Sequence, residues 1–189
     1  MAVWRMRPPN VQQTPDTCWA AAVSSWSRLT GGIPNWMRIS DVIAAFRLWH
    51  PDPVLADGTL ATPRGWIQFA KEHDLRVEEV LIRQLVEHRG RWIFRAPTPS
   101  SGVTPVFAKD LSIHHFADKL RSSHVIVVLP PVDHTSAAHT VVVYGADNKR
   151  VYYMDPNARW EKDKLRERAK YEEFGQGGGA SRYLLIWKP

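Results

Sequence analysis

One cysteine stands near the start of the chain, in the run Gln12-Gln13-Thr14-Pro15-Asp16-Thr17-Cys18-Trp19-Ala20-Ala21. Far downstream, His139 is followed by Asp155 sixteen positions later. A thiol, an imidazole and a carboxylate are the groups with which thiol hydrolases attack a carbonyl carbon. Gln12, six positions before Cys18, adds an amide that can stabilise the oxyanion formed in such an attack. These residue types and spacings predict a nucleophilic thiol site.

The thiol is expected at the start of a helix. Thr14, Asp16 or Thr17 can cap a helix that continues through 20–29. The partial positive charge at a helix N-terminus favours the thiolate, and a nearby imidazolium adds to the effect. The backbone N–H of Cys18 is one expected oxyanion donor and the side chain of Gln12 is the other, with Gln13 as the rival at spacing five.

The histidine and the carboxylate are expected on one hairpin. Two apolar runs, 140–145 and 150–155, predict strands joined by a tight turn. Antiparallel pairing sets their outer ends side by side, so His139 and Asp155 are expected within hydrogen-bonding range. The carboxylate would orient the ring and stabilise its charged form, while the ring moves the proton. Asn157 is the weaker alternative to Asp155.

Taken together, these residues resemble the papain-like cysteine peptidases. The runs His139-Thr-Val-Val-Val-Tyr-Gly and Val151-Tyr-Tyr-Met-Asp155-Pro156 are most similar to two bacterial branches. One is the double-glycine leader peptidases attached to bacteriocin exporters, and the other is the type III effector proteases that cleave host proteins. The resemblance covers both ends of the chain but not residues 51–121.

The resemblance implies a role for each site residue. Gln12 would be the oxyanion donor, Cys18 the nucleophile, His139 the base and acid, and Asp155 the orienting residue. The Asn-Ser-Trp run of plant and lysosomal papains is missing, and Asp155-Pro156 stands in its place, which disfavours a lysosomal type of enzyme. Seventeen residues precede Cys18, with no pro-peptide, so a prokaryotic effector or toxin domain is favoured over a digestive enzyme.

The remaining elements must position these groups. Capping residues, prolines and apolar periodicity predict helices over 41–49 capped by Ser40, over 63–74, over 112–121 capped by Ser112, and over the charged stretch 160–174. Residues 78–88 fit either a helix or a strand followed by a helix, and 94–110 is expected as a long loop. Further strands are predicted at 124–129 and 182–187.

Helices followed by strands predict an α+β fold of papain-like type. The 189 residues suit a single papain-like domain, 1–189, with a helical part over about 1–122 and a β part over about 123–189. The nucleophile helix would pack on the C-terminal antiparallel sheet, with the active site in the cleft between them.

Composition narrows the class of protein. A single cysteine excludes an internal disulfide and indicates a reducing compartment. No run approaches the length of a membrane span, and the N-terminus lacks a secretory signal, so we expect a soluble protein with no membrane association. It would be cytoplasmic where it is made, with delivery into a target cell by a dedicated secretion system as a further expectation.

The charge and the histidines bear on partners and cofactors. The net charge of +6 favours an acidic inhibitor or immunity protein beside the protein substrate. The cations are dispersed among acidic residues, so no nucleic acid is expected as a partner. No cofactor and no metal are expected, because His114, His115, His124 and His134 do not have the spacing of a zinc site.

These observations favour a cysteine endopeptidase that cleaves protein through an acyl-thioester, as a bacterial effector or toxin domain. The same Cys-His-Asp site would also serve glutamine deamidation, transglutamination or peptidoglycan amide hydrolysis. A non-enzymatic binding module that keeps the fold is the third alternative.

Overall fold

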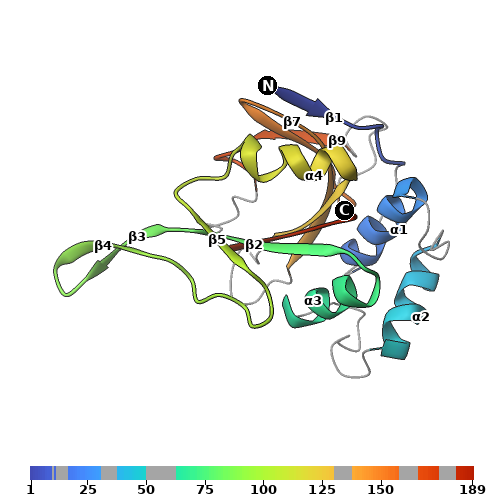
Figure 1. Cartoon of the computed structure of the whole chain (residues 1–189), viewed down its shortest axis with the longest axis horizontal. Helices are drawn as coiled ribbons and strands as arrows, with labels where there is room; N and C mark the ends of the chain where they lie inside the picture. Colours follow the sequence, from blue (N-terminus) through green and yellow to red (C-terminus); the bar gives the residue numbers. More distant parts are fainter. Residues whose placement is uncertain are drawn as a thin grey trace.

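The computed structural model describes residues 1–9, 11, 17–30, 38–49, 63–129, 138–157, 166–174 and 182–189. Within these residues, one eight-stranded sheet forms the centre of the molecule. Three helices lie on one side of it, α1 (Cys18–Thr30), α2 (Ile39–Trp49) and α3 (Pro63–Glu72). A short 3-10 helix, η1 (Ile113–His115), and α4 (Ala117–Ser122) lie on the other side (Figure 1).

The order of strands across the sheet places late segments at its centre. From edge to edge it contains β5 (Pro105–Ala108), β2 (Arg76–Ile82), β10 (Arg182–Trp187), β6 (Val125–Leu129), β7 (His139–Asp147), β8 (Arg150–Met154) and β9 (Arg166–Lys170). A short N-terminal strand, β1 (Ala2–Trp4), pairs with the far end of β7. Neighbours are antiparallel except β2 and β5, which are parallel.

The two faces of the sheet bury two separate cores, because successive side chains of a strand point to opposite faces. One core joins α1, α2 and α3 to alternate residues of the central strands, which are Ile126, Val128, Val142, Met154, Leu184 and Ile186. The other joins η1 and α4 to the intervening residues, among them Val125, Val127, Val141, Val143 and Leu185. The central strands are therefore buried on both faces, which explains their nearly continuous apolar runs.

Helix α1 is enclosed by its neighbours. All ten residues from Cys18 to Ser27 are buried, and the small Ala and Ser side chains among them allow close packing on the sheet. The indole of Trp26 is fully buried and donates from Nε1 to the carbonyl oxygen of His124 at 2.9 Å. Ser25 donates to the carbonyl oxygen of Pro9 at 2.8 Å. These contacts fix the direction of the helix and thereby the position of its first residue.

Strand β1 is attached through a large side chain over a glycine. Trp4 pairs with Gly145 in the ladder between β1 and β7, and its ring lies 4.2 Å from that of Tyr152, centroid to centroid. A Cβ at Gly145 would lie 2.4 Å from Cε3 of Trp4. The indole therefore occupies the space that a side chain at position 145 would need.

A buried carboxylate ties β2 to its surroundings. Glu79 is fully buried and accepts hydrogen bonds from the backbone N–H and the hydroxyl of Ser100, both at 2.7 Å. Nε of Arg182, on the neighbouring strand β10, lies 3.1 Å from Oε1 of Glu79. The pairing of opposite charges and the two hydrogen bonds offset the loss of hydration of the carboxylate.

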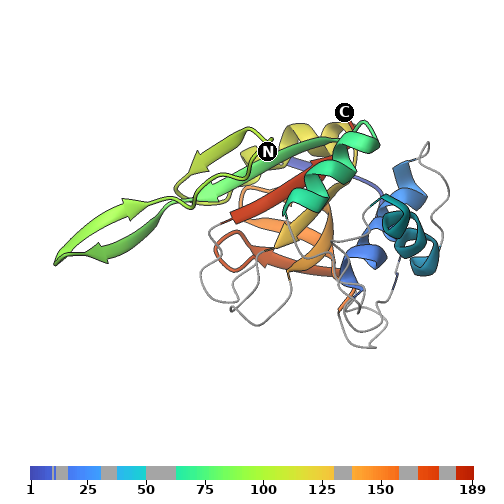
Figure 2. The same cartoon turned by 90° about the horizontal axis from the view of Figure 1, so that it is seen from below.

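Two strands leave the body as a separate hairpin. β3 (Gln84–His88) and β4 (Arg91–Arg95) form a two-stranded sheet that continues from β2 and projects away from the rest of the molecule (Figure 2). Arg89 and Gly90 between them have φ values of 52° and 73°, which are the positive values that a two-residue hairpin turn of type I′ needs.

Several elements differ from those predicted from the sequence. Of the expected helix over 160–174, residues 166–170 form strand β9 and 171–174 a turn, while 160–165 lie outside the described residues. Residues 78–88 contain no helix, since they include the second part of β2 and the whole of β3. The expected loop over 94–110 contains the end of β4 and all of β5. The part predicted as helical, about 1–122, thus contains four strands between 76 and 108, of which β2 and β5 belong to the central sheet and β3 and β4 form a separate hairpin.

Two helix starts also differ in detail. α2 begins at Ile39, so Ser40 lies inside the helix instead of capping it. Ser112 does precede a helix and forms a capping box with His115, but that helix is the short η1. Phe116 interrupts the predicted helix over 112–121, and α4 follows it. The strands predicted at 124–129, 140–145, 150–155 and 182–187 are confirmed as β6, β7, β8 and β10.

Candidate functional site

The hairpin of β7 and β8 brings an imidazole and a carboxylate together. Val142 pairs with Met154, so continuing the ladder by one step sets Asp155 opposite Val141. His139 lies two residues from Val141 and therefore on the same face, diagonal to Asp155. Nε2 of His139 lies 2.6 Å from Oδ1 of Asp155. The contact expected from the sequence is present.

The turn after β8 holds the carboxylate in place. Oδ1 of Asp155 also accepts a hydrogen bond from the backbone N–H of Asn157 at 2.8 Å, as in an Asx turn. Asn157 thus contributes a backbone donor to Asp155, and Asp155 supplies the oxygen beside the imidazole. The side chains of His139 and Asp155 are 27% and 18% exposed, so solvent screens their interaction only in part.

Cys18 completes the group from the other side. It is the first residue of α1, and α1 packs on β6 and β7. Its Sγ lies 3.7 Å from the carbonyl oxygen of Ala138, the residue before His139, and it is near enough to the imidazole to raise the pKa of that ring. Because Nε2 of His139 faces Asp155, the other ring nitrogen, Nδ1, is the one available to the sulfur. Cys18 is 8% exposed, so its sulfur is largely covered.

The electrostatics of His139 follow from these two neighbours. Burial alone opposes protonation of the ring. The hydrogen bonds with Asp155 and with Cys18, together with their negative charges, outweigh that effect and raise the pKa of His139 to about 10. The ring is therefore held as an imidazolium at neutral pH.

Donors for a developing negative charge lie at the start of α1. The first N–H groups of a helix have no acceptor within the helix, and Cys18 holds the first helical position. The first intrahelical acceptor is the carbonyl of Thr17, which receives the N–H of Ala21 at 3.0 Å. Gln12 and Gln13, the predicted side-chain donors, lie outside the described residues.

Two other histidines, His124 and His115, make hydrogen bonds within the fold. Nε2 of His124 lies 2.6 Å from the carbonyl oxygen of Met6, and burial lowers the pKa of His124. Nδ1 of His115 lies 3.1 Å from the backbone nitrogen of Ser112 at the start of η1. Within the described ranges, no group of three His, Cys, Asp or Glu residues is arranged to hold a metal ion. His134 lies outside the described residues.

A surface depression elsewhere offers no comparable chemistry. Its volume is about 340 Å³, and it is lined by Asn148, Lys149, Arg150, Lys170, Tyr171 and Glu172. It lies at the turn between β7 and β8, at the opposite end of this hairpin from His139. Nζ of Lys170 lies 3.4 Å from carboxylate oxygens of Glu172 and Glu173, so its charge is already balanced.

One contact could not have been found from residue types. The carbonyl oxygen of Ala138 accepts from the thiol of Cys18, and a backbone group leaves no trace in the amino-acid type. The position immediately before a candidate histidine on a strand is the only indication that the sequence offers.

No helix among the described segments is long and apolar enough to cross a membrane.

Comparison with known proteins supports the architecture. No protein-family model and no curated protein matches this sequence. Among solved structures, the chain is similar to a candidate C39-like peptidase from Bacillus anthracis, with a TM-score of 0.51 and 15% identity over 100% of this chain and 98% of the other. At that identity the likeness concerns the fold alone. It confirms the expected α+β fold of papain-like type.

Proposed function

We propose that this protein is a cysteine peptidase that cleaves protein substrates through an acyl-thioester, without metal or cofactor. The observation that carries the proposal is the position of the His139 ring between the carboxylate of Asp155, at 2.6 Å, and the thiol of Cys18. An imidazolium beside a sulfur at a helix N-terminus is the arrangement that favours a nucleophilic thiolate. The papain-like fold of the chain agrees with this assignment.

In the first half of the reaction, the thiolate of Cys18 attacks the scissile carbonyl carbon and its electron pair forms the C–S bond. The carbonyl oxygen becomes an oxyanion, which the N–H of Cys18 stabilises together with the side chain of Gln12, our proposed second donor. When the oxyanion collapses, the C–N bond breaks and the imidazolium of His139 gives its proton to the leaving amine. The product is a thioester and a neutral imidazole.

The raised pKa of His139 suits this sequence of events. Part of the increase comes from the hydrogen bond and the negative charge of Cys18. Once the sulfur is acylated, that part disappears, so the pKa of the imidazolium falls when its proton is required. In the second half, neutral His139 removes a proton from water, the hydroxide attacks the thioester, and the thiolate leaves as the imidazolium is restored. Asp155 orients the ring throughout.

The proposal is tested by labelling the thiol and by searching for cleavage. Incubation with the epoxide E-64 should modify Cys18 stoichiometrically, and His139→Ala should slow the reaction by about 10²–10⁴-fold. His115→Ala, which changes another partly buried histidine, is the matched control and should react like the wild type. New protein N-termini should appear when a proteome is incubated with the wild type and not with Cys18→Ala.

The same experiments separate the competing activities. A target whose intact mass rises by about one unit without cleavage would assign glutamine deamidation in place of proteolysis, and release of muropeptides would assign an amidase. Absence of E-64 labelling, in a protein that remains folded, would favour a binding module. Equal appearance of N-termini with Cys18→Ala would overturn the peptidase assignment.

We further propose that the enzyme acts as a bacterial effector or toxin. The similarity of the His139 and Asp155 segments to effector and leader peptidases motivates this role, and the net charge of +6 suits an acidic inhibitor or immunity protein. Expression inside a target cell should be toxic for the wild type and harmless for Cys18→Ala. Equal growth of cells that carry the two forms would contradict the role while leaving the peptidase activity intact.

A further inference from the structure

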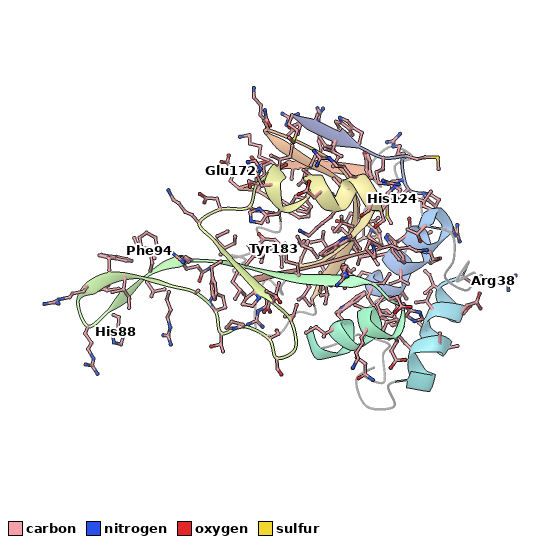
Figure 3. All side chains as sticks on the ribbon, in the orientation of Figure 1. Arg38, His88, Phe94, His124, Glu172 and Tyr183 are labelled. Atoms are coloured by element: carbon pink, nitrogen blue, oxygen red, sulfur yellow. The ribbon has the colours of Figure 1, made fainter. Side chains whose placement is uncertain are left out.

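The β3–β4 hairpin is an arm that extends from the body of the protein. Figure 2 shows it projecting from the end of β2, and Figure 3 shows the labelled side chains of His88 and Phe94 on it, away from the central sheet. In the described part of the chain, neither β3 nor β4 has a second neighbouring strand. Both outer edges of the hairpin therefore present backbone N–H and C=O groups without a strand partner.

One face of the arm is apolar. Leu85 pairs with Phe94 and Glu87 with Trp92, so the four side chains lie on the same face. Leu85, Trp92 and Phe94 are 52%, 66% and 67% exposed. An isolated two-stranded hairpin is only marginally stable in water, and three large apolar side chains on its surface do not improve its solubility. These features indicate that a binding partner covers the apolar face of the hairpin when the protein functions.

The opposite face is cationic. Arg91 and Arg95 lie on the other face, where His88 and Gln84 are their partners across the ladder, and the apolar pair of Val86 and Ile93 lies between them. The segment 83–95 contains four exposed arginines and one carboxylate, that of Glu87. Among the described residues, none of these four arginines forms an ion pair; they are Arg83, Arg89, Arg91 and Arg95.

Three kinds of occupant fit this pattern poorly. A lipid bilayer would require apolar residues at the tip, but the tip carries Arg89 and Arg91. Single-stranded nucleic acid needs stacking rings and cations on one surface, whereas Trp92 and the arginines of β4 lie on opposite faces. A second copy would bring like charges together, because the chain has a net charge of +6.

We propose that the β3–β4 hairpin is a docking arm for an acidic protein, which adds an extended segment of alternating apolar and acidic residues to an open edge of the hairpin. Strand addition satisfies the unpaired backbone groups and makes a three-stranded sheet. Residues directly opposite each other across a ladder share a face. The apolar residues of the segment therefore cover Trp92 and Phe94, and its carboxylates meet Arg91 and Arg95.

Docking at this arm is separate from the thiol site. The arm continues from β2, and β10 and β6 separate β2 from β7, which carries His139. Changes on the arm should therefore leave the reaction of Cys18 with E-64 at its wild-type rate. This rate also reports that each variant is folded.

The test uses two synthetic peptides of identical composition, each of about twelve residues. One alternates glutamate with leucine or valine, and the other places the same residues in apolar and acidic pairs. Fluorescence anisotropy with the full chain should show at least about tenfold tighter binding of the alternating peptide. Trp92→Ser/Phe94→Ser and Arg91→Glu/Arg95→Glu should each weaken that binding about tenfold or more, and added salt should weaken it as well.

Matched controls carry the same changes elsewhere. Met6→Ser alters an exposed apolar residue of the N-terminal segment, and Lys71→Glu/Lys149→Glu alters the net charge by as much as the arginine pair does. Both should bind the alternating peptide as the wild type does. Equal binding of the two peptides, or equal loss in the lysine control, would overturn the proposal.

Other probes decide between occupants. Vesicles of three parts phosphatidylcholine to one part phosphatidylglycerol, a single-stranded oligothymidylate, and sedimentation of the protein alone test lipid, nucleic acid and self-association. Interaction with any of them that requires Trp92 and Phe94 and exceeds binding of the alternating peptide would refute the acidic-segment assignment. No such interaction, together with hairpin-dependent peptide binding, supports it.

Discussion

Nε2 of His139 and Oδ1 of Asp155 lie 2.6 Å apart, and the same oxygen of Asp155 accepts the N–H of Asn157. The turn that follows β8 thus fixes the carboxylate of Asp155, independently of its contact with the imidazole. The orientation of the imidazole is consequently a property of the hairpin formed by β7 and β8, and it does not require the thiol.

The first prediction concerns Asp155→Asn. Removing the carboxylate removes the leading influence that raises the pKa of His139, so the pKa should fall from about 10 toward the ordinary histidine range. NMR titration of the ring carbons of His139 in both proteins measures the change. The pH above which the rate of reaction with E-64 declines should fall by as much as the pKa of His139 does. An unchanged titration in Asp155→Asn would assign the raised pKa to another group.

The second prediction links that pKa to stability. In the folded protein the pKa of His139 is raised from 6.5 to about 10, so the folded state binds its proton more tightly than the unfolded state. The resulting stabilisation is fully present below about pH 6.5 and is lost as the pH rises through 10. We expect the difference in unfolding free energy between Cys18→Ala and Cys18→Ala/His139→Gln to shrink steadily over this interval.

Urea denaturation at about pH 6, 8 and 10 measures this difference. The Cys18→Ala background keeps the ionisation of the thiol out of the comparison, at the expense of the part of the pKa increase that Cys18 provides. A difference that grows with pH would show that the sign is wrong.

The third prediction concerns the buried carboxylate of Glu79. Glu79→Ala removes the ion pair with Arg182, which keeps its hydrogen bond to the carbonyl oxygen of Thr98, and removes the acceptor of both Ser100 hydrogen bonds. Breaking a buried ion pair on one side costs about 3–5 kcal/mol. Glu87→Ala, at an exposed position of β3, is the control and should change the unfolding free energy by no more than about 0.5 kcal/mol. Similar costs for the two variants would mean that the Glu79 contacts contribute nothing net.

The fourth prediction tests the close packing of Trp4 against Gly145. In Gly145→Ala the new methyl group would collide with the indole, since a Cβ there lies 2.4 Å from Cε3. Overpacking of this kind costs about 1–3 kcal/mol. In a Trp4→Ala background the three nearest atoms to the new methyl group are removed, so the same substitution should cost less. A double-mutant cycle measures the coupling energy between positions 4 and 145. Additive effects of the two substitutions would show that the indole of Trp4 is not what the new methyl group meets.

What could be predicted from the sequence follows from burial. The strands β7 and β8 carry apolar side chains on both faces, and the turn between them contains Asp147, whose carboxylate accepts the N–H groups of Lys149 and Arg150. Such runs, bounded by a residue that favours turns, identify strands reliably. The position of His139 relative to Asp155 followed from that hairpin.

Strand β9 could not be predicted in this way. Its sequence, Arg166-Glu167-Arg168-Ala169-Lys170, has one apolar residue, and its alternating charges are equally typical of an exposed helix. It lies at the edge of the sheet, where pairing with β8 determines its conformation. Because that pairing is a tertiary contact, no local pattern reports it.

The hairpin of β3 and β4 escaped prediction for a different reason. No position of either strand is fully buried, since β4 is exposed throughout and β3 alternates only between partly buried and exposed residues, so the pattern of a half-buried strand is weak here. Its turn uses Arg89 at a positive φ, where asparagine or aspartate is the usual residue before glycine. The contacts of Glu79 with Ser100 and Arg182 could not be predicted from the sequence either, since these residues are far apart along the chain.

The separation of Cys18 from Ala138, 120 residues along the chain, has a consequence for biosynthesis. The hairpin that carries His139 and Asp155 forms from local contacts, but the sulfur joins it only after a long stretch of polypeptide has been ordered. Under the proposed function, a chain still on the ribosome, or one that has lost its tertiary structure, would hold a thiol of ordinary reactivity. Destructive activity would thereby be confined to molecules that have completed folding.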